Sequence, residues 1–348
     1  CFEFDWSCCK IPKIIKDGEE LAKIKEILRH GYKHIKESYK YFSAIGSSGS
    51  VPSVGLNVFT EFANSFGLMD GVLMNLADLD FNLKGALFNE VKNNPRNPAN
   101  SLVRYQFMEI IVRLALDKYL RKKVVTSPSE AVQKMLTEDM WPILSKYDSN
   151  KWRWDRYICE DVDLAYKAHK PILDNIWSRF SIRLKKPGQK NFMCLEEFTD
   201  ICTTSGLVNE FFVAREIDVC YNLAMMTQVD ELNYDRFREM SFVEFLEALG
   251  RACEESSMPP LGEPITDTCK QQPLFRKIEN AMPYLLRICP HAIQDMYPHL
   301  KISTNPLLPV RSFVELPEAE RQERTPGVLK LDEAPMIVQA RVSKQATC

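Results

Sequence analysis

Apolar positions in the first half of the chain recur at helical spacing. Asp17 and Glu20 form a helix start signal, and the apolar side chains that follow lie three or four residues apart: Leu21, Ile24, Ile27, Leu28, Ile35, Tyr39 and Phe42. The same pattern predicts a helix stopped by Gly67, one over about 71–79, one over 105–120, and one opening at Ser127-Pro128. No segment alternates like a strand for more than about three residues, so we predict an all-α fold.

Helical spacing continues in the second half and then gives way to proline. A long helix is predicted over 160–180 with Pro171 as a kink or a restart, followed by helices over 195–204, 214–226, 241–254 and about 274–288. Residues 256–348 hold 12 of the 20 prolines. From about residue 305 we expect an extended tail that docks on another chain, or alternatively lies back over its own helices.

The two halves also repeat each other. Residues 54–68 set over 193–207 share five of fifteen positions: Leu56/Leu195, Phe59/Phe198, Thr60/Thr199, Gly67/Gly206 and Leu68/Leu207. An offset of 138 also aligns Phe107, Glu109 and Arg113 with Phe245, Glu247 and Arg251. Matching 75–77 with 222–224 requires an offset of 147, which predicts one loop of changed length. We infer a duplicated unit of four helices.

Two helices of the second half begin with the same spacing, Met193-x-x-x-Glu197-Phe198 and Met240-x-x-x-Glu244-Phe245. This spacing resembles the end of an EF-hand loop, and over roughly 30–255 the chain resembles the calmodulin superfamily. The resemblance implies two tandem EF-hand-like pairs. An apolar residue at loop position 8 would form a short β-bridge with its paired loop, and a glutamate at position 12 would bind calcium.

The loops themselves depart from the calcium-binding pattern. Lys186 and Lys190 occupy ligand positions in the loop before Glu197, where ammonium groups would repel a dication. The most suitable loop offers Asn233, Asp235 and Glu244, and we name these as a candidate calcium site. Asp78-Leu79-Asp80-Phe81-Asn82 imitates the start of such a loop, with a solvated helix end as the alternative. No other cofactor is expected.

Composition limits the remaining classes of function. Lys and Arg number 45 against 47 Asp and Glu, a net charge of −2, which disfavours nucleic acid as a partner. No apolar run approaches the roughly 20 residues that span a bilayer, so no membrane association is expected. Eleven cysteines lack any C-x-x-C pair, which excludes zinc ribbons and favours reduced thiols. No catalytic or nucleotide motif is present, so we expect no enzyme activity.

Two further segments are candidates for binding partner proteins. Trp152, Arg153 and Trp154 mix the residue types that most often anchor interfaces, although they could instead close the core. Arg121, Lys122 and Lys123 form a basic patch that could meet acidic tubulin, or an ordinary solvated helix end.

Degenerate EF-hand pairs keep their helices and can offer a groove to a partner helix. Sequences such as 105–109 and 242–251 resemble EF-hand-like modules of ciliary and flagellar axonemal proteins. This resemblance implies a non-enzymatic scaffold in the cytoplasm and cytoskeleton, at axonemal microtubules, with axonemal proteins and tubulin as partners. A calcium-responsive regulator of motility and an enzyme with an unrecognised site are the alternatives. The expected organisation is 17–126 and 171–255 as EF-hand-like pairs, 127–170 as connector, 256–304 as helical extension and 305–348 as tail.

Overall fold

The computed structural model describes residues 1–45, 52–88, 97–181 and 187–300. The described chain is helical apart from one pair of two-residue strands, which confirms the all-α prediction. The tail from residue 305, and the docking expected of it, lie outside the described residues, as does Lys186.

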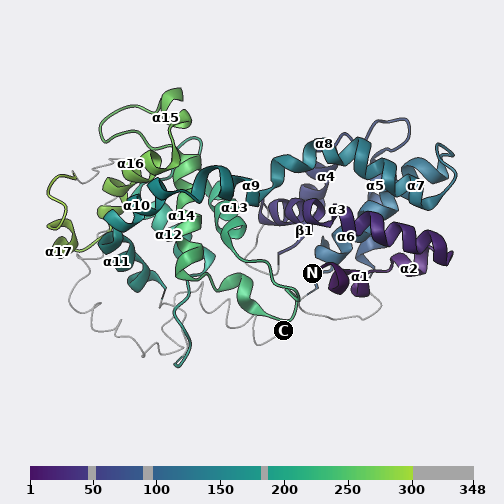
Figure 1. Ribbon diagram of the computed structural model, residues 1–348, viewed down its shortest axis with the longest axis horizontal. Coiled ribbons are helices and arrows are strands. Elements are labelled where there is room, and N and C mark those ends of the chain that lie inside the picture. The colour runs from purple at the N-terminus through teal and green to yellow at the C-terminus, as the bar shows by residue number, and fades with distance from the viewer. Residues whose placement is uncertain (46–51, 89–96, 182–186, 301–348) are drawn as a thin grey trace. The chain divides into compact units, whose positions relative to one another are not determined.

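The chain divides into two compact units (Figure 1). Unit 1 comprises Cys1–Trp152 together with Met226–Phe237. Its elements are α1 (Phe2–Cys8), α2 (Ile11–Ile14), α3 (Gly18–Ile45), β1 (Val54–Gly55), α4 (Leu56–Ser65), α5 (Leu76–Leu87), β2 (Ser101–Leu102), α6 (Arg104–Ala115), η1 (Leu116–Arg121), α7 (Pro128–Lys134), η2 (Met135–Met140), α8 (Trp141–Leu144), η3 (Ser145–Tyr147) and α9 (Ser149–Trp152).

Unit 2 comprises Arg153–Met225 and the chain from Arg238 onward. Its elements are η4 (Arg153–Tyr157), α10 (Glu160–Ala168), α11 (Lys170–Phe180), α12 (Leu195–Ser205), α13 (Ala214–Ala224), α14 (Phe242–Ser256), α15 (Asp267–Gln271), α16 (Leu274–Leu286) and α17 (His291–Gln294). The short turn η5 (Asp235–Arg238) ends where the chain returns to unit 2. Residues 127–152 of the expected connector belong to unit 1, and residues 153–170 belong to unit 2.

The residues that define the repeat occupy matching places in the two units. Gly67 and Gly206 both adopt left-handed backbone, with φ of 59° and 87°, and end α4 and α12. The aligned pairs Phe59/Phe198 and Phe107/Phe245 are fully buried. Phe107 packs on Tyr39 at a ring separation of 5.7 Å, and its counterpart Phe245 packs on Trp177 at 5.8 Å. The same hydrophobic positions therefore build both cores.

Short β-bridges join the loops of each unit at the expected apolar positions. Val54 pairs with Leu102 in the antiparallel strands β1 and β2. Met193 and Met240 form an antiparallel bridge, in which each backbone N–H donates to the other residue's carbonyl at 3.0 Å. These bridges fix the starts of α4, α6, α12 and α14 relative to one another within their units.

Two details of the predicted pattern are wrong. The helix expected over 71–79 is α5 at Leu76–Leu87, because Asn75 rather than Gly71 caps its first turn by accepting hydrogen bonds from Ala77 and Asp78. Asp78–Asn82 therefore lies within a helix and not at the start of a calcium loop. The matching cap of α13 is Val213, 138 residues after Asn75, whereas Asn222 lies near the end of α13. The predicted change of loop length is thus unnecessary.

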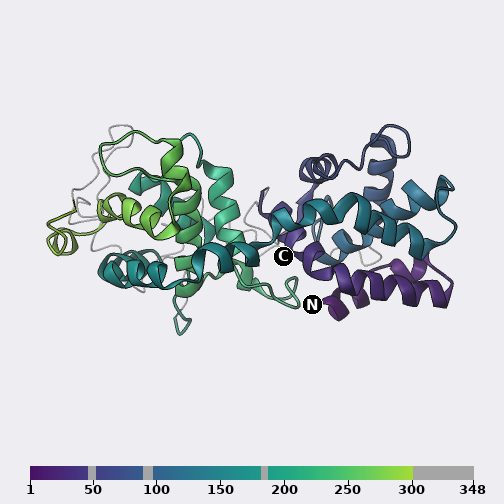
Figure 2. The same ribbon diagram turned by 45° about the horizontal axis from the view of Figure 1, so that its top comes forward.

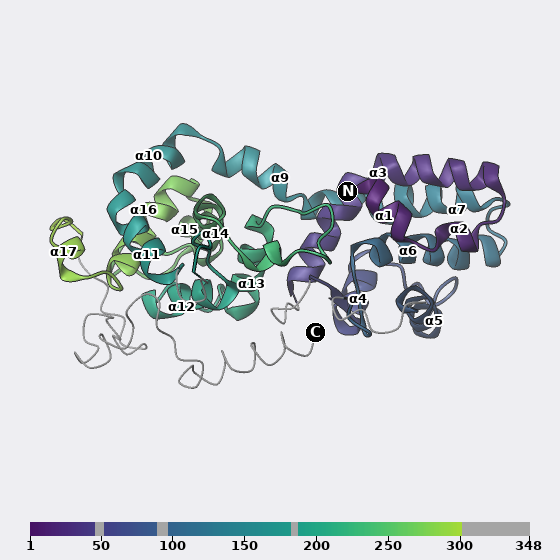
Figure 3. The same cartoon turned by 90° about the horizontal axis from the view of Figure 1, so that it is seen from below.

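A further helix of the chain packs on the four repeated helices of each unit. In unit 1, α7 and η2 lie along α3 and α6 and bury Ala131, Val132, Met135, Leu136 and Met140 (Figure 2). In unit 2 the further helix is α16, which packs on α14 and α12 (Figure 3). The buried Lys277 of α16 donates to Glu254 of α14 at 2.5 Å. Apolar surface expected to receive a partner helix is therefore covered along α7 and α16 by the chain itself.

Candidate functional site

The glutamates at position 12 of the second-unit loops cap the helices that follow. Glu197 accepts a hydrogen bond from the backbone N–H of Cys194 at 2.6 Å. Glu244 accepts from the backbone N–H and the hydroxyl of Ser241 at 2.8 and 2.7 Å. In unit 1, Gln106 accepts from the N–H of Val103 in the same way, at 3.1 Å. The side chain that would bind calcium in an EF-hand thus has a structural use that needs no metal.

The three residues of the candidate calcium site are placed as follows. Asn233 donates to Asp230 at 2.6 Å, Asp235 opens the turn η5, and Glu244 caps α14. Asn233 and Asp235 belong to unit 1, whereas Glu244 belongs to unit 2. Among the residues that the structure describes, no three His, Cys, Asp or Glu side chains are arranged to hold a metal ion.

The predicted basic patch lies at the end of η1. Arg121 forms ion pairs with Asp78 at 3.1 Å and with Asp117 at 2.7 Å, while its side chain stays 57% exposed. Lys122 and Lys123 are exposed. The patch is therefore accessible, with one of its three cations already paired within unit 1.

The predicted tryptophan–arginine segment spans the junction of α9 and η4. Trp152 is half-buried and Trp154 is 72% exposed. Arg153 is used inside unit 2: its Nε donates to both carboxylate oxygens of Glu247 at 2.9 and 2.8 Å, and its Nη2 donates to the carbonyl of Leu223 at 3.0 Å. Trp154 is therefore the exposed member of this candidate partner site.

Lys10 makes the matching contacts in unit 1. Its backbone N–H donates to Glu109 at 2.8 Å, and its ammonium group donates to the carbonyl of Gly85 at 3.1 Å. Glu109 and Gly85 precede Glu247 and Leu223 by 138 residues each. In both units, then, a cation that precedes the repeat links the glutamate of the fourth helix to the end of the third. The aligned residues that define the repeat all lie after Lys10 in the chain, so the alignment does not include it.

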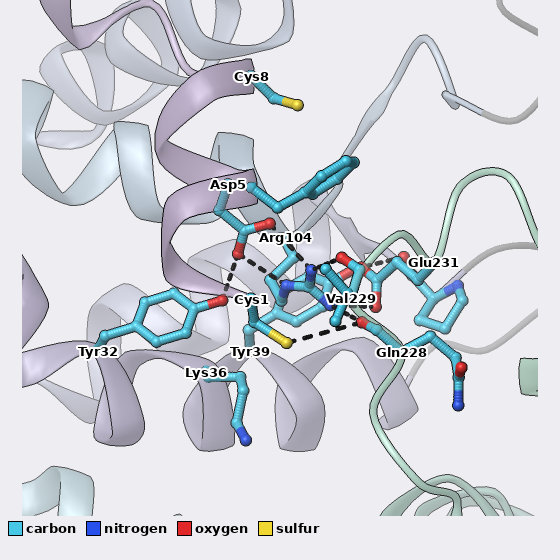
Figure 4. Close-up of polar contacts among 12 residues, drawn as sticks. Cys1, Asp5, Cys8, Tyr32, Lys36, Tyr39, Arg104, Gln228, Val229 and Glu231 are labelled. Carbon is cyan, nitrogen blue, oxygen red and sulfur yellow. Dashed lines mark hydrogen bonds and ion pairs between the residues drawn. The ribbon is translucent and has the colours of Figure 1, made fainter.

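A buried polar cluster around Arg104 is the most elaborate site of the described chain (Figure 4). All five N–H bonds of this guanidinium have acceptors. Nε and Nη2 donate to the carboxylate of Asp5 at 2.7 and 3.0 Å. Nη1 donates to Glu231 at 3.0 Å and to the carbonyl of Gln228 at 2.8 Å, and Nη2 also donates to the carbonyl of Val229 at 2.6 Å.

Three helices and one loop segment bring these groups together. Arg104 is the first residue of α6, and Asp5 lies in α1. Two tyrosines of α3 complete the cluster: Tyr32 donates to Asp5 at 2.5 Å, and Tyr39 donates to Glu231 at 3.0 Å. Their spacing of seven residues places both hydroxyls on one face of α3. The cluster therefore holds Gln228–Glu231 against α1, α3 and α6.

Burial and mutual charge shift the acid–base behaviour of this cluster. Burial raises the pKa of Glu231 to about 7, against the opposing effects of Arg104 and Tyr39. Burial alone would lower the pKa of Arg104, but the hydrogen bonds and charges of Asp5 and Glu231 raise it above its ordinary value. Burial, followed by the charge of Glu231, raises the pKa of Tyr39. The cation is permanent, and the group that can change its charge near neutrality is Glu231.

Sequence reasoning missed this cluster because its members are far apart. Asp5 and Glu231 lie 99 and 127 residues from Arg104. The sequence does show an arginine, Arg104, at the start of a helix rich in apolar residues. No local pattern, however, indicates which distant residues pair with it.

The hydrogen bonds of the cluster attach the segment Gln228–Glu231 to Arg104 and Tyr39. No helix among the described residues is long and apolar enough to cross a membrane. No protein-family model, curated protein or solved structure matches the chain at a significant level.

Proposed function

We propose that this chain is a non-enzymatic scaffold protein whose two EF-hand-like units work without calcium. The observation that carries the proposal is the capping role of Glu197 and Glu244, which occupies the carboxylates at position 12. The bridges at Val54/Leu102 and Met193/Met240 support an EF-hand-like pairing of the loops, since they fall at position 8 of each loop.

Partner proteins bind, in this proposal, to surface that the chain leaves exposed. Because α7 and α16 cover apolar surface of the repeated helices, the proposed binding surfaces among the described residues are the exposed patch Arg121–Lys123 and the exposed Trp154. The tail from residue 305, which lies outside the described residues, is a third proposed binding segment. The resemblance to axonemal EF-hand-like modules supports a proposed location at ciliary or flagellar microtubules, with axonemal proteins and tubulin as the proposed partners.

Calcium titration separates the scaffold from a calcium-responsive regulator. Isothermal titration of the full chain should detect no site tighter than about 10⁻⁴ M, the weak end for such loops. A micromolar site that disappears in Glu244→Gln would overturn the calcium-independent proposal and favour the regulator.

Microtubule co-sedimentation tests the basic patch. The chain should pellet with microtubules at low salt and less at high salt, because exposed charges are screened. A triple Arg121→Ala, Lys122→Ala, Lys123→Ala variant should bind several-fold more weakly. Lys13→Ala with Lys16→Ala removes exposed charge elsewhere in unit 1 and serves as the control. Equal losses in both variants would exclude a specific patch.

Location in a ciliated cell tests the axonemal assignment. The tagged protein should stay with axonemes after detergent removes the membrane. Complete release into the detergent extract would contradict a stable place in the axoneme.

A further inference from the structure

The Arg104 cluster carries one more negative group than positive. Asp5 takes two N–H donors of the guanidinium and Glu231 takes a third, so two carboxylates share one cation. Asp5 is 1% exposed, Arg104 3% and Glu231 9%. Burying an uncompensated charge is costly, and a carboxyl group in this position relieves the cost by binding a proton.

Of the two carboxyl groups that contact Arg104, Glu231 is the one that can bind this proton. Glu231 faces Arg104 of α6, Tyr39 of α3 and Asp5 of α1, with Asp230 beside it in its own segment, while Tyr32 of α3 faces Asp5. Cys8 of α1 and Lys36 of α3 lie at the edge of the cluster, and Lys36 forms an ion pair with Glu37 at 3.3 Å. Asp5 accepts two hydrogen bonds from the guanidinium, whereas Glu231 accepts one from the guanidinium, one from the backbone of Arg104 and one from Tyr39.

The contacts of Arg104 attach the segment Met226–Phe237 to α6 of unit 1. The chain enters it from Met225 and leaves it at Arg238, both of unit 2, so the segment is tied to unit 1 by noncovalent contacts alone. Three of its acceptors, the carbonyls of Gln228 and Val229 and the carboxyl of Glu231, converge on the one guanidinium. A change of charge at Glu231 therefore acts directly on this attachment of the segment.

We propose that Met226–Phe237 is a clasp that tightens when Glu231 binds a proton and loosens when Glu231 ionises. With the proton bound, Asp5 and Arg104 form a neutral pair, and the Glu231 carboxyl still accepts from Arg104. With the proton lost, the buried cluster has a net negative charge and the docked segment is disfavoured relative to the released one. This inference is independent of the proposed scaffold function.

The sign and size of the pH effect on docking follow from proton linkage. The pKa of Glu231 is about 7 when docked, above its ordinary value of 4.5, so the docked segment binds the proton more tightly than the released one. Stabilisation by this group is complete below about pH 4.5 and is lost as the pH rises through about 7. Between pH 6 and pH 8 the docking equilibrium should weaken about tenfold.

Hydrogen–deuterium exchange of the full chain measures this equilibrium directly. After correction for the intrinsic pH dependence of exchange, protection of peptides covering 226–237 should fall about tenfold from pH 6 to pH 8. In Glu231→Gln, which cannot ionise, protection should not change with pH. Asp218→Asn removes a half-buried carboxyl with a raised pKa, in unit 2, and should leave the clasp profile as in the wild type.

Tyr39→Phe provides a second variant that keeps the core volume. Loss of the Tyr39 hydroxyl removes a hydrogen bond that favours the ionised carboxylate, so the transition should move to higher pH. A wild-type profile that is flat between pH 6 and 8 would overturn the proposal. So would an unchanged tenfold fall in Glu231→Gln, or a transition in Tyr39→Phe that moves to lower pH.

Discussion

Arg104 illustrates how one residue can govern a distant part of the chain. Its guanidinium is buried, and such a group is tolerated only when acceptors replace the water it has lost. Here the acceptors come from α1 and from Gln228–Glu231, so satisfying one side chain organises two other segments. Removing it would leave two buried carboxyl groups without their cation.

Arg104→Ala should therefore lower the free energy of unfolding of unit 1 by about 3–5 kcal/mol, the range for breaking a buried pair from one side. Arg121→Ala is the matched control, because Arg121 also pairs with two carboxylates but is 57% exposed. Its loss should cost less than about 1 kcal/mol. Chemical denaturation followed by tryptophan fluorescence measures both, and equal costs would contradict the role given to burial.

Asp218 of α13 is a carboxyl group whose removal should stabilise the protein, by an amount that depends on pH. Burial raises its pKa to about 6, so its carboxyl favours the fold when protonated and opposes it once ionised. Asp218→Asn should raise stability by about 1 kcal/mol at pH 7.5, a value reduced because water partly screens this half-buried carboxylate, and should have little effect near pH 4.

Thermal unfolding at the two pH values checks this prediction. Asp163→Asn, which changes a 58% exposed carboxylate of the same unit, is the control and should alter stability little at either pH. A destabilised Asp218→Asn at pH 7.5 would mean that the carboxylate has a stabilising partner.

At the scale of the helix, the first turn of α14 determines what the Glu244 carboxylate does. α14 begins at Phe242 with Ser241 as its cap, and Glu244 returns to that cap from the first turn. This arrangement stabilises the helix whether or not the loop before it can bind a metal. A glutamate at position 12 is therefore not by itself a sign of calcium binding.

Substitutions at Glu244 distinguish a cap from a metal ligand. Glu244→Gln keeps an oxygen that can accept from Ser241 and should lose less than about 0.5 kcal/mol, whereas Glu244→Ala should lose about 1 kcal/mol. Both values should be the same in chelator and in millimolar calcium, measured by thermal unfolding. A calcium-dependent stabilisation of the wild type that both variants lose would contradict the capping interpretation.

The helices could be predicted from the sequence where apolar spacing and a local stop signal agree. Phe59 with Gly67, and Phe198 with Gly206, define α4 and α12 because both signals lie within one helix. The start of α5 could not be predicted correctly, because Gly71 and Asn75 are both plausible boundaries and the choice depends on hydrogen bonds to Ala77 and Asp78. The Arg104 cluster was beyond sequence reasoning, since it depends on tertiary pairing.

Across the whole chain, duplication extends to polar contacts as well as to the core. Glu109 accepts from Arg113 at 2.8 Å, and Glu247 accepts from Arg251 at 3.0 Å, four residues along each fourth helix. Each glutamate also pairs with a second cation from outside the aligned region: Lys10 pairs with Glu109, and Arg153 pairs with Glu247. Each unit therefore includes the segment before its first repeated helix, which sequence identity alone did not reveal.

This equivalence predicts that Lys10 and Arg153 perform the same task in separate units. Lys10→Met and Arg153→Met should each lower the stability of their own unit by about 1.5–3 kcal/mol, the range for hydrogen bonds to charged groups. Because the two residues belong to different units, the double variant should show both losses without coupling beyond about 0.5 kcal/mol.

Hydrogen exchange of the full chain assigns each loss to its unit without assuming that the chain unfolds in one step. Lys10→Met should reduce protection in α5 and α6 and leave α13 and α14 unchanged, and Arg153→Met should do the reverse. Lys23→Met, which removes a 59% exposed cation paired with Glu20, is the control and should alter neither region. If Arg153→Met leaves α13 and α14 fully protected, Arg153 is not the counterpart of Lys10, and its place at an interface with a partner protein becomes the better account of this residue.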